Sequence, residues 1–205
     1  QPWNSLGCFE SFNHFKCGNC GYEYFEGVGT TSNDLYEHDV DYLDDLDIFS
    51  NVSSRLLWHH KQVEGHIVAN MPIGSKILDV GCFDGFFVHR LRMLGYQAFG
   101  IDFNKIAIEA GRRKFLLDDA IFHVSIDDIA KLGSDYDAVT AFEVIEHVDD
   151  PVTFVSSITK MVKSNGLIAI STPNSEMSWR PPLDYPPHHL SRFTPKALSL
   201  LISRY

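Results

Sequence analysis

Short apolar runs alternate with amphipathic segments from residue 76 to the end of the chain. The apolar runs predict strands near 76–80, 97–101, 119–123, 136–142 and 166–172. The amphipathic segments predict helices near 86–94, 104–114, 151–162 and 195–203. Alternation of this kind is typical of parallel strands joined by crossover helices. We therefore expect an α/β fold: a Rossmann-like, doubly wound, mainly parallel sheet with helices on both faces.

The pattern divides the chain into three parts. Residues 1–33 are rich in cysteine, glycine and aromatic side chains, with little periodicity, and we expect a small irregular segment there. Residues 34–74 are predicted to form a helical cap and lead-in, with one helix over 52–70. Residues 75–205 carry the alternating pattern and form the main domain.

The most informative stretch begins with the apolar run that precedes Gly81. This run breaks into Gly81-x-x-x-Gly85 and then into an apolar, helix-like segment. A strand, a glycine turn and a helix start in that order let backbone amides approach a ligand closely. Asp102 follows 21 residues after Gly81, the usual distance to an acidic residue that binds a ribose diol. The stretch therefore predicts a site for a nucleoside cofactor.

Two residues distinguish this turn from a dinucleotide fingerprint. Phe83 stands where the second glycine of Gly-x-Gly-x-x-Gly belongs. Asp79 lies at the mouth of the turn, where a carboxylate would repel a pyrophosphate but attract the ammonium and sulfonium groups of S-adenosylmethionine. Together with Asp84, Asp102 and Glu143 it would make an acidic pocket suited to that cationic cofactor.

Four motifs occur in order between residues 72 and 202. They are Asp79-Val80-Gly81-Cys82-Phe83-Asp84-Gly85, Gly100-Ile101-Asp102, Ala141-Phe142-Glu143-Val144-Ile145-Glu146-His147-Val148 and Pro187-His188-His189-Leu190-Ser191-Arg192-Phe193-Thr194. The first three resemble motifs of class I S-adenosylmethionine-dependent methyltransferases. The fourth resembles a segment of the branch that includes ubiquinone-pathway O-methyltransferases. The resemblance implies an enzyme that uses S-adenosylmethionine.

The cofactor-binding residues follow from these motifs. Asp127 is the best candidate to accept a bond from the adenine amino group, and Ile126 would pack on the ring. The alternative is that Asp127 caps the segment that follows. The full set of expected cofactor residues is Asp79, Gly81, Cys82, Phe83, Gly85, Asp102, Phe103, Ser125, Ile126, Asp127, Phe142 and Glu143. Phe83 and Ser125 depart from the residues commoner in the family, where a glycine and an aspartate stand.

The candidate catalytic residues are His147, His189 and Glu146. Glu143, Glu146 and His147 are spaced i, i+3 and i+4, so a helical turn would point all three to one side. His188 and His189 follow a Pro-rich loop that would fold over the site as a lid.

Three interpretations of this acidic and histidine-rich group stay open. The resemblance implies a divalent metal at Glu143, Glu146 and His147 that would bind acceptor oxygens. In the second, His147 or His189 acts as a general base that the glutamates orient. In the third, Glu143 lines the cofactor while Glu146 and His147 cap the next turn. Of the two functional readings we favour the metal-free one, because no sequence pattern fixes the position of the Pro-rich loop.

A second candidate metal site lies near the N-terminus. Cys17-Gly18-Asn19-Cys20 is typical of a zinc-knuckle turn, in which two thiolates share one tetrahedral ion. One such pair supplies half a site, and Cys8 and His14 are the nearby candidates for the rest. The alternative is a degenerate knuckle that holds no metal.

Charge and composition narrow the function further. The net charge of −10 argues against charge-driven binding to nucleic acid or to an anionic membrane. No apolar run approaches the ~20 residues that span a bilayer, and without a signal peptide we expect a cytoplasmic protein. The chain starts at Gln1 and stops inside a predicted helix, so we expect a fragment that lacks the C-terminal strands of its fold.

The leading functional prediction is methyl transfer from S-adenosylmethionine to a small-molecule acceptor, most simply to a hydroxyl, with carbon or nitrogen as alternatives. The competing hypothesis is a non-catalytic methyltransferase-like module that binds cofactor or a partner. Methylation of an RNA 2′-hydroxyl fits poorly with the acidic charge. The sequence indicates neither the acceptor nor the oligomeric state.

Overall fold

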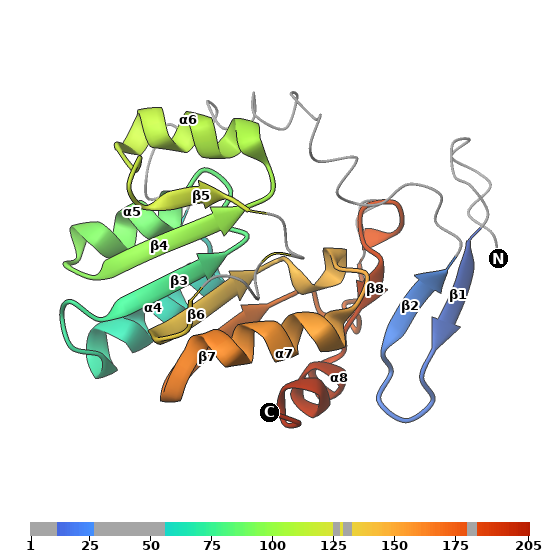
Figure 1. The fold of residues 1–205 in the computed structure, drawn as a ribbon. Coiled ribbons are helices and arrows are strands. Elements are labelled where there is room, and N and C mark those ends of the chain that lie inside the picture. The colour runs from blue at the N-terminus through green and yellow to red at the C-terminus, as the bar shows by residue number, and fades with distance from the viewer. Residues whose placement is uncertain (1–11, 27–55, 125–127, 129–132, 180–183) are drawn as a thin grey trace.

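A computed structural model describes residues 12–26, 56–124, 128, 133–179 and 184–205. Its main body is a five-stranded sheet, and a second, smaller sheet lies beside the carboxyl-terminal part of the chain (Figure 1). Among the residues in these ranges, no helix is both long and apolar enough to cross a membrane.

The large sheet is parallel throughout, with the strand order β5-β4-β3-β6-β7. Its strands are β3 (Lys76–Val80), β4 (Gln97–Asp102), β5 (Ile121–His123), β6 (Tyr136–Phe142) and β7 (Val162–Ser171). The strand order reverses between β3 and β6, and ligands of such sheets bind at this switch point, beyond the carboxyl ends of the strands. The predicted fold class is confirmed.

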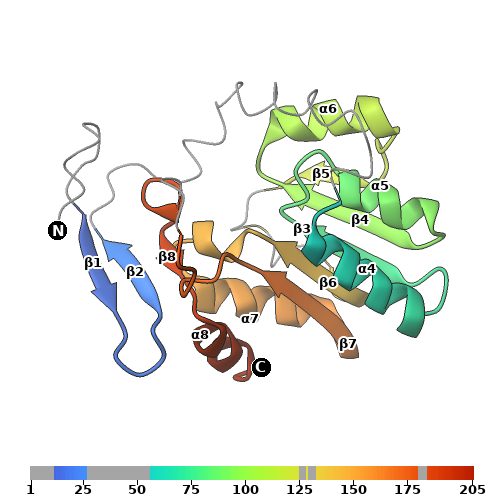
Figure 2. The same cartoon turned by 180° about the vertical axis from the view of Figure 1, so that it is seen from behind.

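Helices cover both faces of this sheet (Figures 1 and 2). One face carries α4 (Trp58–Asn70), α5 (Phe86–Met93) and α6 (Lys105–Phe115), and the other carries α7 (Pro151–Met161) and α8 (Pro195–Ile202). Asn104 caps α6 as its residue type predicts, because its side chain accepts a bond from the N–H of Ala107 at 2.9 Å. Asp150 caps α7 in the same way.

The alternation of side chains along β3 explains why the sheet has two cores. Ile77 joins the apolar cluster that includes α4 and α5, whereas Leu78 and Val80 join the cluster that includes α7 and α8. Because successive side chains of a strand point to opposite faces, a near-continuous apolar run places one core on each side. This burial holds the carboxyl end of β3 rigidly in the middle of the sheet.

The small sheet is antiparallel and was not predicted. Its strands are β1 (Asn13–Lys16), β2 (Glu23–Glu26) and β8 (Ser191–Arg192), in the order β1-β2-β8. All four residues of β1 are exposed, so the strand shows no alternation of apolar and polar positions. The sheet joins an N-terminal hairpin to the segment that follows the Pro-rich loop.

Candidate active site

The glycine turn after β3 requires glycine for a packing reason. Gly81 has φ 75°, and a Cβ atom built there would lie 2.3 Å from Cγ2 of Val144. Gly85 likewise has φ 72°. Any other residue at Gly81 would be strained and would push away the segment that leads to Glu146.

The backbone amides of this turn are largely occupied within the protein. The N–H groups of Gly81 and Cys82 both donate to the carbonyl of Ile101, at 2.8 and 3.0 Å. The N–H of Phe83 donates to Asp102 at 2.8 Å. These donors are engaged within the protein, and contact of Gly81, Cys82 and Phe83 with a cofactor stays a prediction. A turn whose donors are occupied and whose neighbours are carboxylates suits a cation better than a pyrophosphate.

Asp79 is buried at the carboxyl end of β3. Its Oδ1 accepts a hydrogen bond of 2.6 Å from the hydroxyl of Thr140 on β6. Burial raises the pKa of Asp79 to about 7; the Thr140 bond opposes this shift and the charge of Asp102 adds to it. A cationic group placed beside the carboxylate would favour its ionised form.

Asp102 ends β4 and is held by two backbone amides. Its Oδ2 accepts from Phe83 and its Oδ1 accepts from Asn104, both at 2.8 Å. Burial raises the pKa of Asp102 to about 6, although these amide bonds favour the ionised form. Each carboxylate oxygen can accept more than one hydrogen bond, so the two oxygens of Asp102 can still accept from the two hydroxyls of a ribose.

Two neighbouring residues serve the packing of the turn. Asp84 accepts from the N–H of Phe86 at 3.2 Å and so supports the start of α5. Cys82 is buried against β4, where a Cβ on Gly100 would lie 2.6 Å from its Sγ. Burial raises the pKa of the Cys82 thiol well above its usual range. Any contact of Cys82 with a cofactor would therefore come from its backbone.

An aromatic cluster, which no sequence pattern predicts, lies at the end of β6. The ring of Phe142 stacks on His59 at 5.1 Å between centroids and meets the edge of Phe87 at 5.4 Å. Burial lowers the pKa of His59, and the charge of Glu143 opposes that shift. Because α4 and β6 lie far apart in sequence, no local pattern could have paired these rings.

Glu146 is the most deeply buried acidic group after β6. It lies in the short 3-10 helix η2 (Ile145–His147) and is 1% exposed. Burial raises its pKa to about 8, and the charge of Glu143 contributes to that rise. Its Oε2 has no hydrogen-bond partner among the described residues. A buried oxygen without a donor is a natural ligand for a cation.

Two histidines face Glu146 with defined hydrogen bonds. Nδ1 of His147 donates to the carbonyl of His188 at 2.7 Å, and Nδ1 of His189 lies 3.1 Å from Oδ1 of Asp184. A carbonyl or a carboxylate only accepts, so each neutral ring carries its proton on Nδ1 and its lone pair on Nε2. Burial, together with the nearby His189, lowers the pKa of His147 to about 4.

These three side chains form one possible metal site. A ligand atom from each of Glu146, His147 and His189 lies within 4.8 Å of the other two. The rings of His147 and His189 meet edge to face at 4.8 Å. Their donor set, a carboxylate oxygen and two neutral imidazoles, fits Mn²⁺ or Zn²⁺. The predicted catalytic residues are thus brought together.

Glu143 does not belong to this group, which corrects the expected ligand set. The helical turn begins only at Ile145, and Glu143 itself has φ 54°. Its Oε1 instead accepts a 2.7 Å bond from the hydroxyl of Ser171. The prediction from the i, i+3, i+4 spacing was wrong for Glu143, because the backbone there is left-handed and so does not continue a right-handed helical turn.

The cysteine pair lies in the turn between β1 and β2. The pKa of Cys17 is lowered chiefly by the backbone N–H of Cys20, as expected of a knuckle turn. His14 is engaged elsewhere, because its Nε2 lies 3.0 Å from Glu23. Among the described residues, three candidate metal ligands come together only at Glu146, His147 and His189. Cys8 lies outside the described residues. Zinc at Cys17 and Cys20 stays a prediction.

The expected adenine-binding segment also lies outside the described residues. It comprises Ser125, Ile126 and Asp127. Phe103 is half-buried directly after Asp102, and its contact with the cofactor stays a prediction. The adenine contacts therefore stay predictions.

Comparison with known proteins agrees with this geometry. The sequence model of a methyltransferase domain family matches residues 34–205. The chain belongs to this methyltransferase domain family. The predicted family is thereby confirmed, and the four motifs correctly indicated it.

Two further comparisons describe relatives of this methyltransferase domain. The mitochondrial ubiquinone biosynthesis O-methyltransferase of Schizosaccharomyces pombe is 34% identical over 105 residues, which are 48% of this chain and 38% of that protein. A SAM-dependent methyltransferase structure from Archaeoglobus fulgidus superposes with a TM-score of 0.59 at 20% identity, over 81% of this chain and 73% of that one. The chain thus spans less than half of that curated relative.

A third likeness limits what the fold says about chemistry. The structure of the [4+2]-cyclase SpnF superposes with a TM-score of 0.63 at 16% identity, covering 85% of this chain and 72% of that one. At such identities the likeness shows the fold alone. Function must therefore be argued from the residues of the site.

Proposed function

We propose that the protein transfers a methyl group from S-adenosylmethionine to a hydroxyl of a small-molecule acceptor. The observation that carries this proposal is the grouping of Glu146, His147 and His189 beyond β6, beside the strand ends that hold Asp79 and Asp102. The O-methyltransferase named among the relatives supports the same reaction.

The cofactor end of the site would bind by charge and by ribose recognition. When bound, S-adenosylmethionine supplies a methyl group that a nucleophile takes by in-line displacement. Asp79 would accept from the ammonium group, and Asp102 would accept from the ribose hydroxyls. Gly81 allows the turn to pack closely against Val144, where any side chain would clash.

The acceptor end would hold a divalent metal rather than act through a histidine base. His147, with a pKa of about 4, is a weak general base near neutral pH but a good neutral ligand. When bound, a divalent cation lowers the pKa of an adjacent hydroxyl and orients it. Glu146, His147 and His189 would hold that cation, and the unpartnered Oε2 of Glu146 would point to it. This reverses the preference for a metal-free site that the sequence alone suggested.

The decisive experiment separates cofactor binding, metal binding and turnover. Calorimetry should detect S-adenosylmethionine and S-adenosylhomocysteine binding, and a second titration should detect Mn²⁺. Radiolabelled methyl transfer to a panel of hydroxylated small molecules should then depend on Mn²⁺ and stop with a chelator. If the folded protein binds neither form of the cofactor, the enzyme proposal is wrong and a non-catalytic module remains. Turnover that survives chelation would favour a base at His147 or His189.

A further inference from the structure

We propose that Glu23, Arg192 and Asp184 are positioning residues that fix the ring and the tautomer of His189. The N-terminal hairpin of β1 and β2 would then help to position an active-site residue. The inference rests on the proposed role of His189 in the acceptor site. The contacts run from Glu23 through the buried charges of Arg192 and Asp184 to His189.

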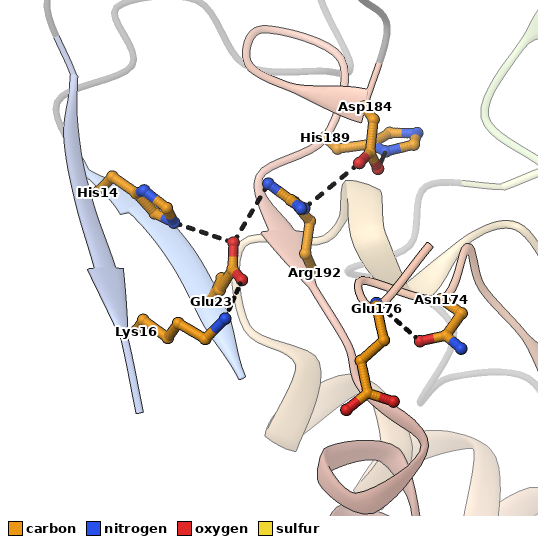
Figure 3. Close-up of polar contacts among 8 residues, drawn as sticks. All are labelled: His14, Lys16, Glu23, Asn174, Glu176, Asp184, His189 and Arg192. Carbon is orange, nitrogen blue, oxygen red and sulfur yellow. Dashed lines mark hydrogen bonds and ion pairs between the residues drawn. The ribbon is translucent and has the colours of Figure 1, made fainter. Parts of the chain in front are cut away.

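The contacts form one unbroken chain (Figure 3). Nη1 of Arg192 lies 3.1 Å from Oε2 of Glu23, and its Nε lies 3.4 Å from Oδ2 of Asp184, an ion pair that lacks hydrogen-bond geometry among the described residues. The other oxygen of Asp184 lies 3.1 Å from Nδ1 of His189. The guanidinium thus bridges a carboxylate from the hairpin and the carboxylate that holds the histidine.

Burial makes the members of this chain depend on one another. Glu23 is 3% exposed, Arg192 is 4% and Asp184 is 2%. Removing one partner from a buried ion pair leaves an uncompensated charge, so the loss of any member would move the rest. Lys16 lies 3.0 Å from the outer oxygen of Glu23 and completes the charge balance at the solvent side.

Backbone bonds tie the same segment to the small sheet and to η2. In β2 and β8, Glu23 pairs with Arg192. Leu190 accepts from the N–H of Phe25 at 3.1 Å and donates its own N–H to the carbonyl of Glu146 at 2.8 Å. The segment that carries His189 is therefore clamped between the hairpin and the turn that carries Glu146.

The chain also determines which nitrogen of His189 faces the site. An ionised Asp184 only accepts, so His189 must donate from Nδ1 and keep its lone pair on Nε2. Arg192 lies against the other carboxylate oxygen of Asp184 and so holds that side chain in place. Carboxylates that support ligand histidines act in this way, and their loss typically weakens metal binding about 10- to 100-fold.

The test compares Asp184→Asn, Glu23→Gln and Arg192→Lys with the parent protein and with Glu176→Gln as control. Glu176 is exposed, and in Figure 3 its carboxylate points away from the chain of contacts. Nitrogen NMR of the imidazoles should show the Nδ1–H tautomer of His189 in the parent and in the control. Asp184→Asn presents an amide that can donate, so the Nε2–H tautomer should appear.

Calorimetry with Mn²⁺ alone supplies the second readout. Asp184→Asn should lower Mn²⁺ affinity about 10- to 100-fold, and Glu23→Gln and Arg192→Lys should lower it by a smaller factor. S-adenosylhomocysteine affinity should stay unchanged in all variants, which separates positioning from unfolding. A parent that binds no Mn²⁺ would count against the proposed metal, while the tautomer comparison would still test the positioning chain. An unchanged His189 tautomer in Asp184→Asn, or an Nε2–H tautomer in the parent, would overturn the inference.

If Glu23→Gln does not fold, Arg192→Lys becomes the deciding variant for the hairpin. It keeps the positive charge but loses the planar fork that reaches both carboxylates. A well-folded Arg192→Lys protein with parental Mn²⁺ affinity and a parental His189 spectrum would show that the hairpin does not position His189.

Discussion

The hydroxyl of Thr140 donates to the carboxylate of Asp79 across the switch point of the sheet, at 2.6 Å. This bond joins the two strands whose carboxyl ends flank the candidate site, β3 and β6. It partly offsets the effect of burial, which still raises the pKa of Asp79 to about 7. The charge of this site should therefore change within the physiological pH range.

We expect cofactor affinity to rise between pH 5.5 and 7.5. The ammonium group of S-adenosylmethionine prefers an ionised Asp79, whose pKa is raised to about 7, so binding should strengthen as that proton leaves. Asp79→Asn keeps an acceptor for Thr140 but carries no charge. Calorimetric affinities for this variant should be weaker at pH 7.5 and should rise less steeply across the range, with the remaining slope due to Asp102, whose pKa is raised to about 6; the same slope as in the parent would contradict the assignment.

The same residue should lower the stability of the cofactor-free protein at neutral pH. The folded pKa of Asp79 is raised, so its favourable contribution is full below about pH 4 and is lost as pH rises through about 7. We expect Asp79→Asn to increase the free energy of unfolding at pH 7.5 by roughly 1–3 kcal/mol. Urea denaturation at pH 5 and pH 7.5 measures this, and the gain should shrink at the lower pH.

Asp102 should account for much of the ribose recognition. Asp102→Ala removes charge-assisted bonds to two hydroxyls, so binding of S-adenosylhomocysteine should weaken by about 1.5–3 kcal/mol. Competition by adenosine should weaken in parallel, whereas competition by methionine should not change. A variant that binds as well as the parent would show that the second motif is misassigned.

Two helical glycines offer a matched pair for stability. A Cβ on Gly111 of α6 would lie 2.0 Å from the backbone oxygen of Asp84, whereas a Cβ on Gly65 of α4 would meet nothing within 4 Å. Gly111→Ala should force α6 away from the cofactor turn and destabilise the fold by about 2–4 kcal/mol. Gly65→Ala should instead be neutral or stabilise by up to about 1 kcal/mol. Thermal unfolding compares the two, and equal melting temperatures would refute the close approach.

Glu146 should matter for turnover and little for cofactor binding. Glu146→Gln replaces the unpartnered buried oxygen with an amide, so Mn²⁺ affinity and kcat should fall at least tenfold. The affinity for S-adenosylhomocysteine should stay within about twofold, since Asp79 and Asp102 are untouched. Turnover that persists in Glu146→Gln but disappears in His147→Ala would point to a base rather than a metal.

The sequence predicted those parts of the structure that depend on local pattern. The run Lys76–Val80 is a buried strand, and Asn104 caps the helix after β4, because both rest on nearby residues. The small sheet escaped prediction because β1 is short and wholly exposed. The pairing of Glu23 with Arg192 joins residues far apart in the chain, which no periodicity encodes.

The candidate site was predicted in its residue types but not in its geometry. His147, His189 and Glu146 do come together, yet Glu143 turns away because its backbone adopts a left-handed conformation. Asp184 gave no signal, since its role depends on where the Pro-rich loop returns to the sheet. The side-chain positions around a metal follow from tertiary contacts, which spacing alone does not determine.

The hydrogen bonds inside the glycine turn also limit how this pocket could be redesigned. Replacing Phe83 by glycine would supply the second glycine of the dinucleotide fingerprint and relieve a left-handed residue with φ 52°, while Phe86 would still stand where the third glycine belongs. The amides of Gly81 and Cys82 would still be bonded to the carbonyl of Ile101, and Asp79 would still face the turn. A nicotinamide-dependent descendant of this domain would therefore need a new path for the β4 backbone. Substituting the motif residues alone would leave a turn whose amides still cannot bind a pyrophosphate.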